Sequence, residues 1–237
     1  MPTFARRSDR NERIGLLAAC AVCSVLLWQT TIGSYLLYPF TILATWFHEM
    51  GHGLAALLTG NSFERLLIFP DGSGLAFSSR DPDGYSLTDA FIAAGGPLGP
   101  ALAGSGLILA SRHNDTTKSA LLLLGLSLLL STAIWVRSLT GWIVLPIMGV
   151  LILALAVRGS ATHQRLAIQI LGVQAAISVW QQFDYLFSAG GVVDGQSMRS
   201  DTSAIAEALF FPYWFWGSAL SGIIIASIWW SLRRALR

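Results

Sequence analysis

The chain has 237 residues, of which 54% are hydrophobic and only 12% are charged, about half of the roughly 25% found in an average soluble domain. So few charges could not cover the surface of one or two soluble domains. The apolar content excludes a disordered chain, and two cysteines exclude a disulfide-stapled secreted fold. A net charge of +2 gives no reason to expect nucleic acid as a partner. These exclusions leave an integral membrane protein in a lipid bilayer.

Long stretches without Asp, Glu, Lys or Arg predict where the chain crosses the bilayer. The first runs from Ile14 to Phe47, which is too long for one crossing, because roughly 20 apolar residues span about 30 Å of hydrocarbon. Tyr38-Pro39 is a natural break within it. We expect an all-α polytopic membrane protein with about six or seven transmembrane or re-entrant helices, at about 14–37, 40–59, 88–111, 117–136, 139–157, 164–188 and 208–232.

The basic residues near both termini set the expected topology. Four arginines predict a cytoplasmic N-terminal tail at 1–13, followed by a single polytopic membrane domain at 14–237. Three arginines after the last segment favour a cytoplasmic C-terminus as well. Seven full crossings cannot satisfy both, so we expect one segment to be re-entrant. The glycine- and proline-rich segment 88–111 is the best candidate, and the modest length of the chain favours a bacterial plasma membrane.

One connection between the segments, at 61–87, is long enough to hold structure of its own. The runs 63–69 and 74–77 are β-prone and flank the turn sequence Pro70-Asp71-Gly72-Ser73. This pattern predicts a small β-hairpin at about 63–77. The hairpin follows directly after the segment 40–59, which carries the chemistry.

That segment contains His48-Glu49-Met50-Gly51-His52, an HExxH motif. Positions i and i+4 of a helix share one face, so both histidines can reach one ion. Zinc binds imidazole nitrogen at about 2.0–2.1 Å, and in catalytic sites it keeps one position open for water, whose pKa it lowers to about 7. Glu49 is near enough to accept a proton from that water. We therefore predict His48 and His52 as ligands of Zn²⁺ and Glu49 as the catalytic residue.

The surroundings of the motif distinguish a metal site from a chance match. An ionisable residue at membrane depth costs about 2.5–3.5 kcal/mol on insertion scales. Two histidines and a glutamate in an apolar helix therefore need a compensating interaction, which a metal ion supplies. The alternative is a set of satisfied core polar groups.

With these residues the chain resembles the site-2 protease family of intramembrane zinc metallopeptidases, and more closely its compact branch without a PDZ domain. In that family a Gly-Pro-Leu segment follows the hairpin, matched here by Gly96-Pro97-Leu98, and a later segment supplies an aspartate as third ligand. The branch also carries a Ser-Asp-small motif before its last helix, matched by Ser200-Asp201-Thr202. The chain departs from the family in having Gly99-Pro100 where an asparagine is usual, and in lacking NxxP before a membrane Asp-Gly.

Three aspartates are candidates for the third zinc ligand. Asp201 fits the resemblance, although Ser200-Asp201 is equally typical of a helix N-cap. Asp184 is the acidic residue deepest within an apolar segment, with an interfacial carboxylate as the alternative. Asp194-Gly195 copies the Asp-Gly of the family but is also a turn sequence.

The resemblance implies a protease that cleaves membrane-embedded or membrane-adjacent proteins or peptides. An alternative is a zinc-binding membrane scaffold or transporter-like protein that keeps the fold without turnover, because intramembrane His/Asp clusters also relay ions. The intact Glu49 favours the enzyme, since a site that only binds metal needs the histidines but no base.

Overall fold

A computed structural model describes residues 3–79, 87–181 and 183–236 of the chain. Its elements, in chain order, are α1 (Thr3–Trp28), α2 (Thr31–Leu58), β1 (Phe63–Ile68), β2 (Gly74–Ser78), α3 (Leu87–Ala110), α4 (Asn114–Ile134), α5 (Leu139–Arg158), α6 (Ala161–Gln181), α7 (Phe183–Leu186), β3 (Gly190–Val193), β4 (Gln196–Arg199), α8 (Asp201–Ala208) and α9 (Tyr213–Ala235).

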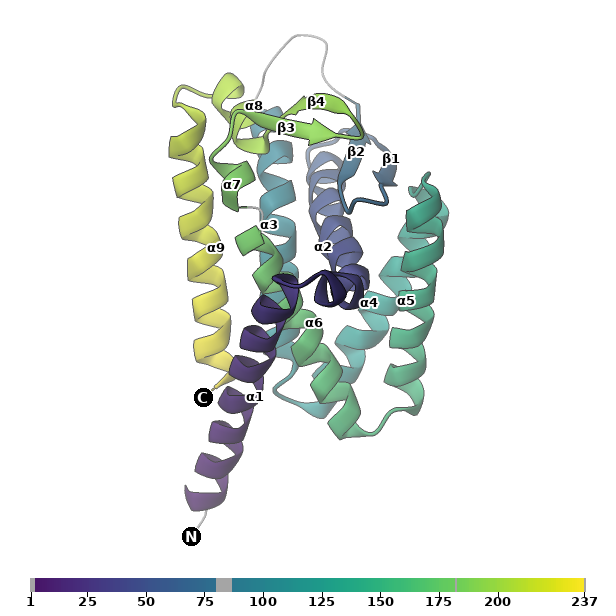
Figure 1. The fold of residues 1–237 in the computed structure, drawn as a ribbon, viewed down its shortest axis with the longest axis vertical. Coiled ribbons are helices and arrows are strands. Elements are labelled where there is room, and N and C mark those ends of the chain that lie inside the picture. Colours follow the sequence, from purple (N-terminus) through teal and green to yellow (C-terminus); the bar gives the residue numbers. More distant parts are fainter. Residues whose placement is uncertain (1–2, 80–86, 182, 237) are drawn as a thin grey trace.

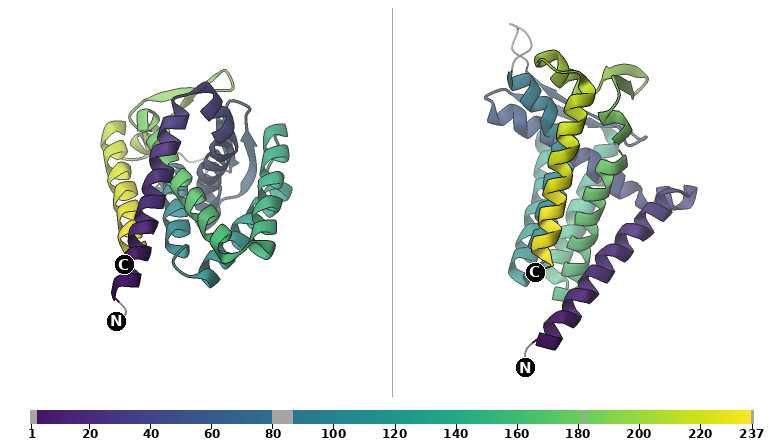
Figure 2. Two further views of the ribbon diagram at one scale, coloured as in Figure 1. Left: turned by 60° about the horizontal axis from the view of Figure 1, so that its bottom comes forward. Right: turned by 90° about the vertical axis from the view of Figure 1, so that its left-hand side faces the viewer.

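The helices form a bundle with two distinct ends. Helices α3, α4, α5, α6 and α9 run along the long axis of the molecule, and α1 leans against them at an angle (Figures 1 and 2). All four strands and the short helix α8 gather at one end, which we call the strand end (Figure 1). The N- and C-termini both lie toward the opposite end, which we call the terminal end (Figure 1).

The prediction of an all-α polytopic membrane protein is confirmed. Four described helices, α3, α4, α5 and α9, are long and apolar enough to cross a membrane, and α1 with α2 forms a bent pair, which brings the number to five if the pair is one span. Helix α6 has a similar length but buries Gln164, Gln169 and Gln174, so it is too polar to count on composition alone. The predicted number of six or seven spans is therefore approximate.

The predicted break at Tyr38-Pro39 is wrong, because α2 continues through Pro39 and the chain bends before it, by 117° between α1 and α2. Thr30 caps α2 there, and its hydroxyl oxygen accepts a hydrogen bond from the Gly33 amide at 3.0 Å. A β-carbon on Gly33 would lie 2.0 Å from the Leu27 carbonyl oxygen, so the tight turn requires glycine. The Thr30 cap and the close approach of Gly33 to Leu27 thus determine where the helix breaks. A proline such as Pro39 is tolerated inside a membrane helix.

The prediction that 88–111 is re-entrant is also wrong. Helix α3 is continuous over 24 residues, with Pro97 and Pro100 inside it, and it is one of the four candidate spans. The predicted segments 14–37 and 40–59 instead form the bent pair of α1 and α2, an arrangement found in broken spans and in re-entrant loops. Both termini lie toward the same end of the bundle (Figure 1).

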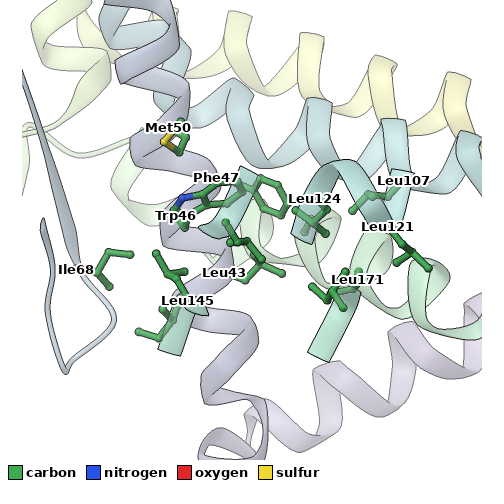
Figure 3. Packing of buried hydrophobic residues seen from close by; sticks show 14 of the residues in the cluster. Leu43, Trp46, Phe47, Met50, Ile68, Leu107, Leu121, Leu124, Leu145 and Leu171 are labelled. Carbon is green, nitrogen blue, oxygen red and sulfur yellow. The ribbon is translucent and has the colours of Figure 1, made fainter. Parts of the chain in front are cut away.

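Buried apolar side chains form two clusters. The first surrounds the middle of α2, where Leu43, Trp46 and Phe47 pack against residues of α4, α5 and β1 (Figure 3). Within it the Trp46 indole donates a hydrogen bond to the Ser131 hydroxyl at 2.9 Å, so its polar atom is satisfied. The second cluster joins α3, α8 and α9 and includes Ala93, Ile205 and Leu220. The two clusters meet at α3, which contributes residues to both.

The predicted hairpin at 63–77 is confirmed as β1 and β2, an antiparallel pair in which Leu66 lies opposite Ala76. The outer edge of β1 is closed, because the Leu66 amide donates to the Trp135 carbonyl at 2.8 Å and the Leu66 carbonyl accepts from the Arg137 amide at 2.9 Å. In an antiparallel ladder opposite residues alternate between bonded and non-bonded pairs. Ala76 therefore turns its own amide and carbonyl away from β1, toward the interior of the strand end.

A second antiparallel hairpin, β3–β4, was not predicted from the sequence. Its two-residue turn is Asp194-Gly195, and both residues have positive φ, at 49° and 75°. Asp-Gly is a preferred sequence for this turn because both positions need the left-handed region. The interpretation of Asp194-Gly195 as a turn sequence is therefore confirmed. Strand β4 leads directly into α8.

Candidate metal centre

The two histidines of the motif lie in the second half of α2, one turn apart and facing the same way. Their Nε2 atoms are 3.2 Å from each other, and His48 is 9% exposed. His52 Nδ1 lies 2.8 Å from the carbonyl oxygen of Ile92 in α3. Because a carbonyl can only accept, Nδ1 carries the proton, and Nε2 of the neutral ring presents its lone pair to the site.

Asp201 is the first residue of α8, and it reaches the histidines from the other side. Asp201 Oδ2 lies 3.1 Å from His48 Nε2, and Oδ1 lies 3.3 Å from His52 Nε2. The three side chains form the one group of His, Cys, Asp or Glu among the described residues that is placed to hold a metal ion.

The residues on either side of Asp201 hold its backbone in place. Ser200 and Thr202 are fully buried, and their hydroxyls donate to the carbonyls of Ser188 at 2.6 Å and Leu186 at 2.9 Å. Ser200 also caps α8 by accepting from the Ser203 amide. The Ser-Asp-Thr sequence therefore acts as an N-cap and as an anchor at once.

The distances among the three side chains fit a zinc ion. Two ligands that each lie 2.0–2.1 Å from a tetrahedral centre are about 3.3 Å apart. The three closest separations here are 3.1, 3.2 and 3.3 Å. Asp201 Oδ2 is buried and has no hydrogen-bond partner among the described residues, so a lone pair remains to be satisfied. The two imidazole nitrogens and the carboxylate of Asp201 are therefore placed to hold a metal cation between them.

Glycines on α3 let the histidine-bearing helix approach closely. A β-carbon on Gly96 would lie 2.2 Å from His52 Nε2 and 2.7 Å from His48 Nε2. One on Gly51 would lie 2.1 Å from the Gly95 carbonyl oxygen, and one on Gly99 would lie 2.3 Å from the Phe47 carbonyl oxygen. The glycine-rich segment thus lets the two helices approach closely, and Gly96 also leaves room for the donor atoms.

Glu49 is buried beside the three donor residues and points toward β2. The Ala76 backbone amide, on the inner edge of β2, forms a hydrogen bond with its carboxylate. A β-carbon on Gly74 would come within 2.8 Å of Glu49 Oε1, so this strand passes directly over the carboxylate. The hairpin thus orients the predicted base.

These residues line a cavity of about 620 Å³ at the strand end. Its walls include His48 and Glu49 of α2, Leu75 and Ala76 of β2, and Ser197 and Met198 of β4. Tyr185 also lines it, and the Tyr185 hydroxyl donates to the Arg199 carbonyl at 3.0 Å, two residues before Asp201. Burial, followed by the charges of Asp201 and Glu49, raises the pKa of Tyr185 above its ordinary value, so this hydroxyl keeps its proton.

The other two aspartates are not brought to the centre. Asp184 is exposed in the first turn of α7, and Asp194 is exposed in the turn of the second hairpin. Neither belongs to the group formed by His48, His52 and Asp201. Of the three candidates for the third ligand, the geometry therefore favours Asp201 alone.

Comparison with known families agrees with this geometry. Residues 17–231 match the model of one family, which is described as Peptidase M50B-like. The chain belongs to the Peptidase M50B-like family. The resemblance to the site-2 proteases is thereby confirmed, and the matched range contains all of the residues of the metal centre. Neither the curated proteins nor the solved structures gave a match.

Three features of this Peptidase M50B-like site were not predicted from the sequence. Gly74 lies over Glu49, Tyr185 supports the segment before Asp201, and the second hairpin forms one wall of the cavity. The role of Gly96 was partly indicated by the sequence, because this residue lies in the conspicuous Gly95-Gly96-Pro97 segment. Nothing in the sequence indicated the role of Tyr185, since a single tyrosine in an apolar segment looks like an interfacial residue.

Proposed function

We propose that the chain is a zinc metallopeptidase that cleaves peptide bonds within or beside the membrane. The observation that carries the proposal is the convergence of three metal-ligand atoms next to a buried carboxylate in one cavity. Membership of the Peptidase M50B-like family supports it independently. The substrates would be membrane proteins or peptides.

In this proposal His48, His52 and Asp201 hold the zinc ion. Zinc, when bound, supplies a Lewis acid that polarises the scissile carbonyl and makes water more acidic. Glu49 accepts a proton from the attacking water and returns it to the leaving amine. The Ala76 amide holds the Glu49 carboxylate in position for both transfers, and the tautomer of His52 is held by the Ile92 carbonyl.

We further propose that the substrate binds as an extended strand along the inner edge of β2. The opposite edge of β1 is occupied by the α4–α5 connection, whereas β2 faces the cavity. Strand addition suits such an edge, and a membrane helix must unwind before hydrolysis because its carbonyls are otherwise bonded. Replacing Leu67 or Ile68 with proline removes a backbone donor from the hairpin and should abolish cleavage. Unchanged cleavage would count against this binding mode.

Metal analysis of the purified protein tests the assignment of roles. The Glu49→Gln variant should retain stoichiometric zinc and lose cleavage, because it lacks only the base. The Asp201→Ala variant should lose zinc, whereas Asp184→Ala, as the matched control, should keep both zinc and cleavage. Zinc retained in Asp201→Ala and lost in Asp184→Ala would move the ligand to Asp184. Wild-type protein that binds zinc but cleaves no membrane peptide would favour a scaffold.

A further inference from the structure

The second hairpin, β3–β4, has two outer edges with unpaired backbone groups. The Ser200 amide donates to the Ala189 carbonyl at 3.3 Å, so these opposite residues form a hydrogen-bonded pair. Bonded and non-bonded pairs alternate along an antiparallel ladder, which makes Val192 and Ser197 a non-bonded pair. The amide and carbonyl of Ser197 therefore point away from β3, and those of Val192 point away from β4.

The outer edge of β4, and not that of β3, faces the cavity of the metal centre. Ser197, Met198 and Arg199 line this cavity, whereas Val192 does not. At Arg199 the edge is already in use, because its carbonyl accepts the hydrogen bond from Tyr185. Ser197 lies two residues along the same edge. Within the described part of the chain its amide and carbonyl have no hydrogen-bond partner, so they are open to a chain that enters the cavity.

Strand β2 faces the same cavity, but the donor at its centre is already bonded. The Ala76 amide forms a hydrogen bond with the Glu49 carboxylate. The next amide that points inward is that of Gly74, because Gly74 lies opposite Ile68 in another non-bonded pair. A substrate strand that paired with β2 alone would therefore find no free donor directly beside the base, whereas β4 offers one from the other wall.

The cavity between the two strands has the size of a short extended segment. Strands β2 and β4 both lie at the strand end but belong to separate two-stranded sheets, so they do not pair with each other (Figure 1). Strands lie about 4.8 Å apart, sheets about 10 Å apart, and each residue advances about 3.3 Å, so one strand residue occupies about 160 Å³. The cavity of about 620 Å³ therefore holds about four extended residues.

We propose that an extended segment of about four residues binds between β2 and β4, as the middle strand of a sheet that joins the two hairpins. This inference rests on the proposed function, because the segment belongs to the peptide substrate. The backbone of Ser197 on one side and of Gly74 on the other holds the segment in register beside the metal centre. Recognition of this kind selects substrates that unwind over a few residues and have no proline there, since proline lacks the amide donor.

Binding of a transition-state analogue to the zinc-loaded full chain in detergent tests this pairing without measuring cleavage. The probe is a phosphinic hexapeptide of leucine and alanine, in which a phosphinate that binds zinc replaces the central amide. Its matched control is the same compound with N-methylated backbone amides, which cannot donate to a strand edge. Acetohydroxamate, which binds zinc but has no peptide backbone, reports on the metal centre alone. We expect N-methylation to weaken binding by at least about tenfold, because several hydrogen bonds are lost.

Proline variants of the second hairpin test the contribution of β4 itself. Ser197→Pro removes the amide that faces the cavity and leaves the ladder to β3 intact, because that amide is not part of the ladder. It should weaken binding of the phosphinic peptide about fivefold, the usual contribution of one hydrogen bond, and leave acetohydroxamate binding unchanged. The control, Val192→Pro, removes the equivalent amide from the opposite edge and should bind both probes as the wild type does. In the wild type the bound peptide should slow hydrogen exchange at β2 and at β4.

The outcomes separate this inference from the proposed function. Equal binding of the peptide by the two proline variants, slower exchange at β2 alone, or equal binding of the N-methylated peptide overturns the pairing with β4 and leaves the metal centre standing. A wild type that holds neither zinc nor acetohydroxamate contradicts the proposed function, and the pairing with it. Should Ser197→Pro lose zinc, the two peptides and the exchange pattern of the wild type decide.

Discussion

Two hydroxyl groups determine where the Asp201 carboxylate points. Ser200 and Thr202 flank it, and both donate to carbonyls of the segment that precedes the second hairpin. Neither hydroxyl contacts the histidines directly, yet each fixes the backbone on one side of the ligand. Outer contacts of this kind commonly change metal affinity by about 10–100-fold.

Removing one of these hydroxyls should weaken the metal centre. Thr202→Val keeps the shape of the side chain but leaves the buried Leu186 carbonyl without its donor, which costs about 1–3 kcal/mol of stability. We expect reduced zinc affinity and a lower free energy of unfolding, measured by chelator competition and detergent denaturation. The control is Ser218→Ala, which removes an exposed hydroxyl bonded within α9 and should change neither quantity.

Gly96 offers a second test at the scale of one atom. A methyl group in Gly96→Ala would occupy the space where the two imidazole nitrogens converge, so zinc binding should weaken by at least about tenfold. The control is Gly106→Ala in the same helix, where a β-carbon meets no described atom within 4 Å. Equal zinc content in the two variants would contradict the proposed place of the ion beside Gly96.

The sequence predicted the site residues that share one helix, but it did not decide which remote residue supplies the third ligand. His48, Glu49 and His52 share one helix, so the helical period alone places the two imidazoles together. Asp201 is brought to them by the packing of α8 against α3 and α9, which no local period encodes. Asp184 and Asp194 therefore remained alternatives until the fold was known. Glycines such as Gly74 have no functional side chain, so their role becomes clear only when the fold shows which side chains lie against them.

At the scale of elements, patterns with a local cause were predictable. The first hairpin follows from a Pro-Asp-Gly turn between two β-prone runs. The position of the helix break does not, because it depends on the Thr30 cap and on the approach of Gly33 to Leu27, while Pro39 was the more conspicuous residue. Hydropathy likewise counted two crossings where the chain forms one bent pair of helices. It also overlooked β3–β4, since Gly190–Val193 is short and rich in glycine.

The attachment of the first hairpin should matter for catalysis more than for metal binding. The Ile68 amide is buried and donates to the Ser138 hydroxyl at 2.8 Å, which fixes β1 to the start of α5. Ser138→Ala leaves that amide unpaired, so the hairpin shifts and the Ala76 amide no longer holds Glu49 in place. We expect zinc content to be retained and kcat for a membrane peptide to fall several-fold. Ser160→Ala, at an exposed position near the other end, should leave both unchanged.

At the scale of the whole molecule, the metal centre lies where the two hydrophobic clusters meet. His48 and His52 extend from α2, whose middle is surrounded by the first cluster. Asp201 begins α8, which packs in the second cluster. An ion held by all three residues joins the two clusters, in addition to the packing of α3 between them. Without the ion, the lone pairs of the two imidazole nitrogens and of the Asp201 carboxylate face one another and oppose this arrangement.

Zinc should therefore stabilise the protein by linking its two halves. A ligand that binds the folded state alone, at a free concentration 100 times its Kd, adds about 2.7 kcal/mol to the free energy of unfolding. We expect chelation to lower the Tm of the wild type and to speed hydrogen exchange at α8 and at the end of α2, while α4 and α5 keep their protection. The Asp184→Ala variant should respond to zinc as the wild type does. A zinc-dependent Tm shift that persists in Asp201→Ala would contradict the link between the clusters, because that variant has lost the donor from α8.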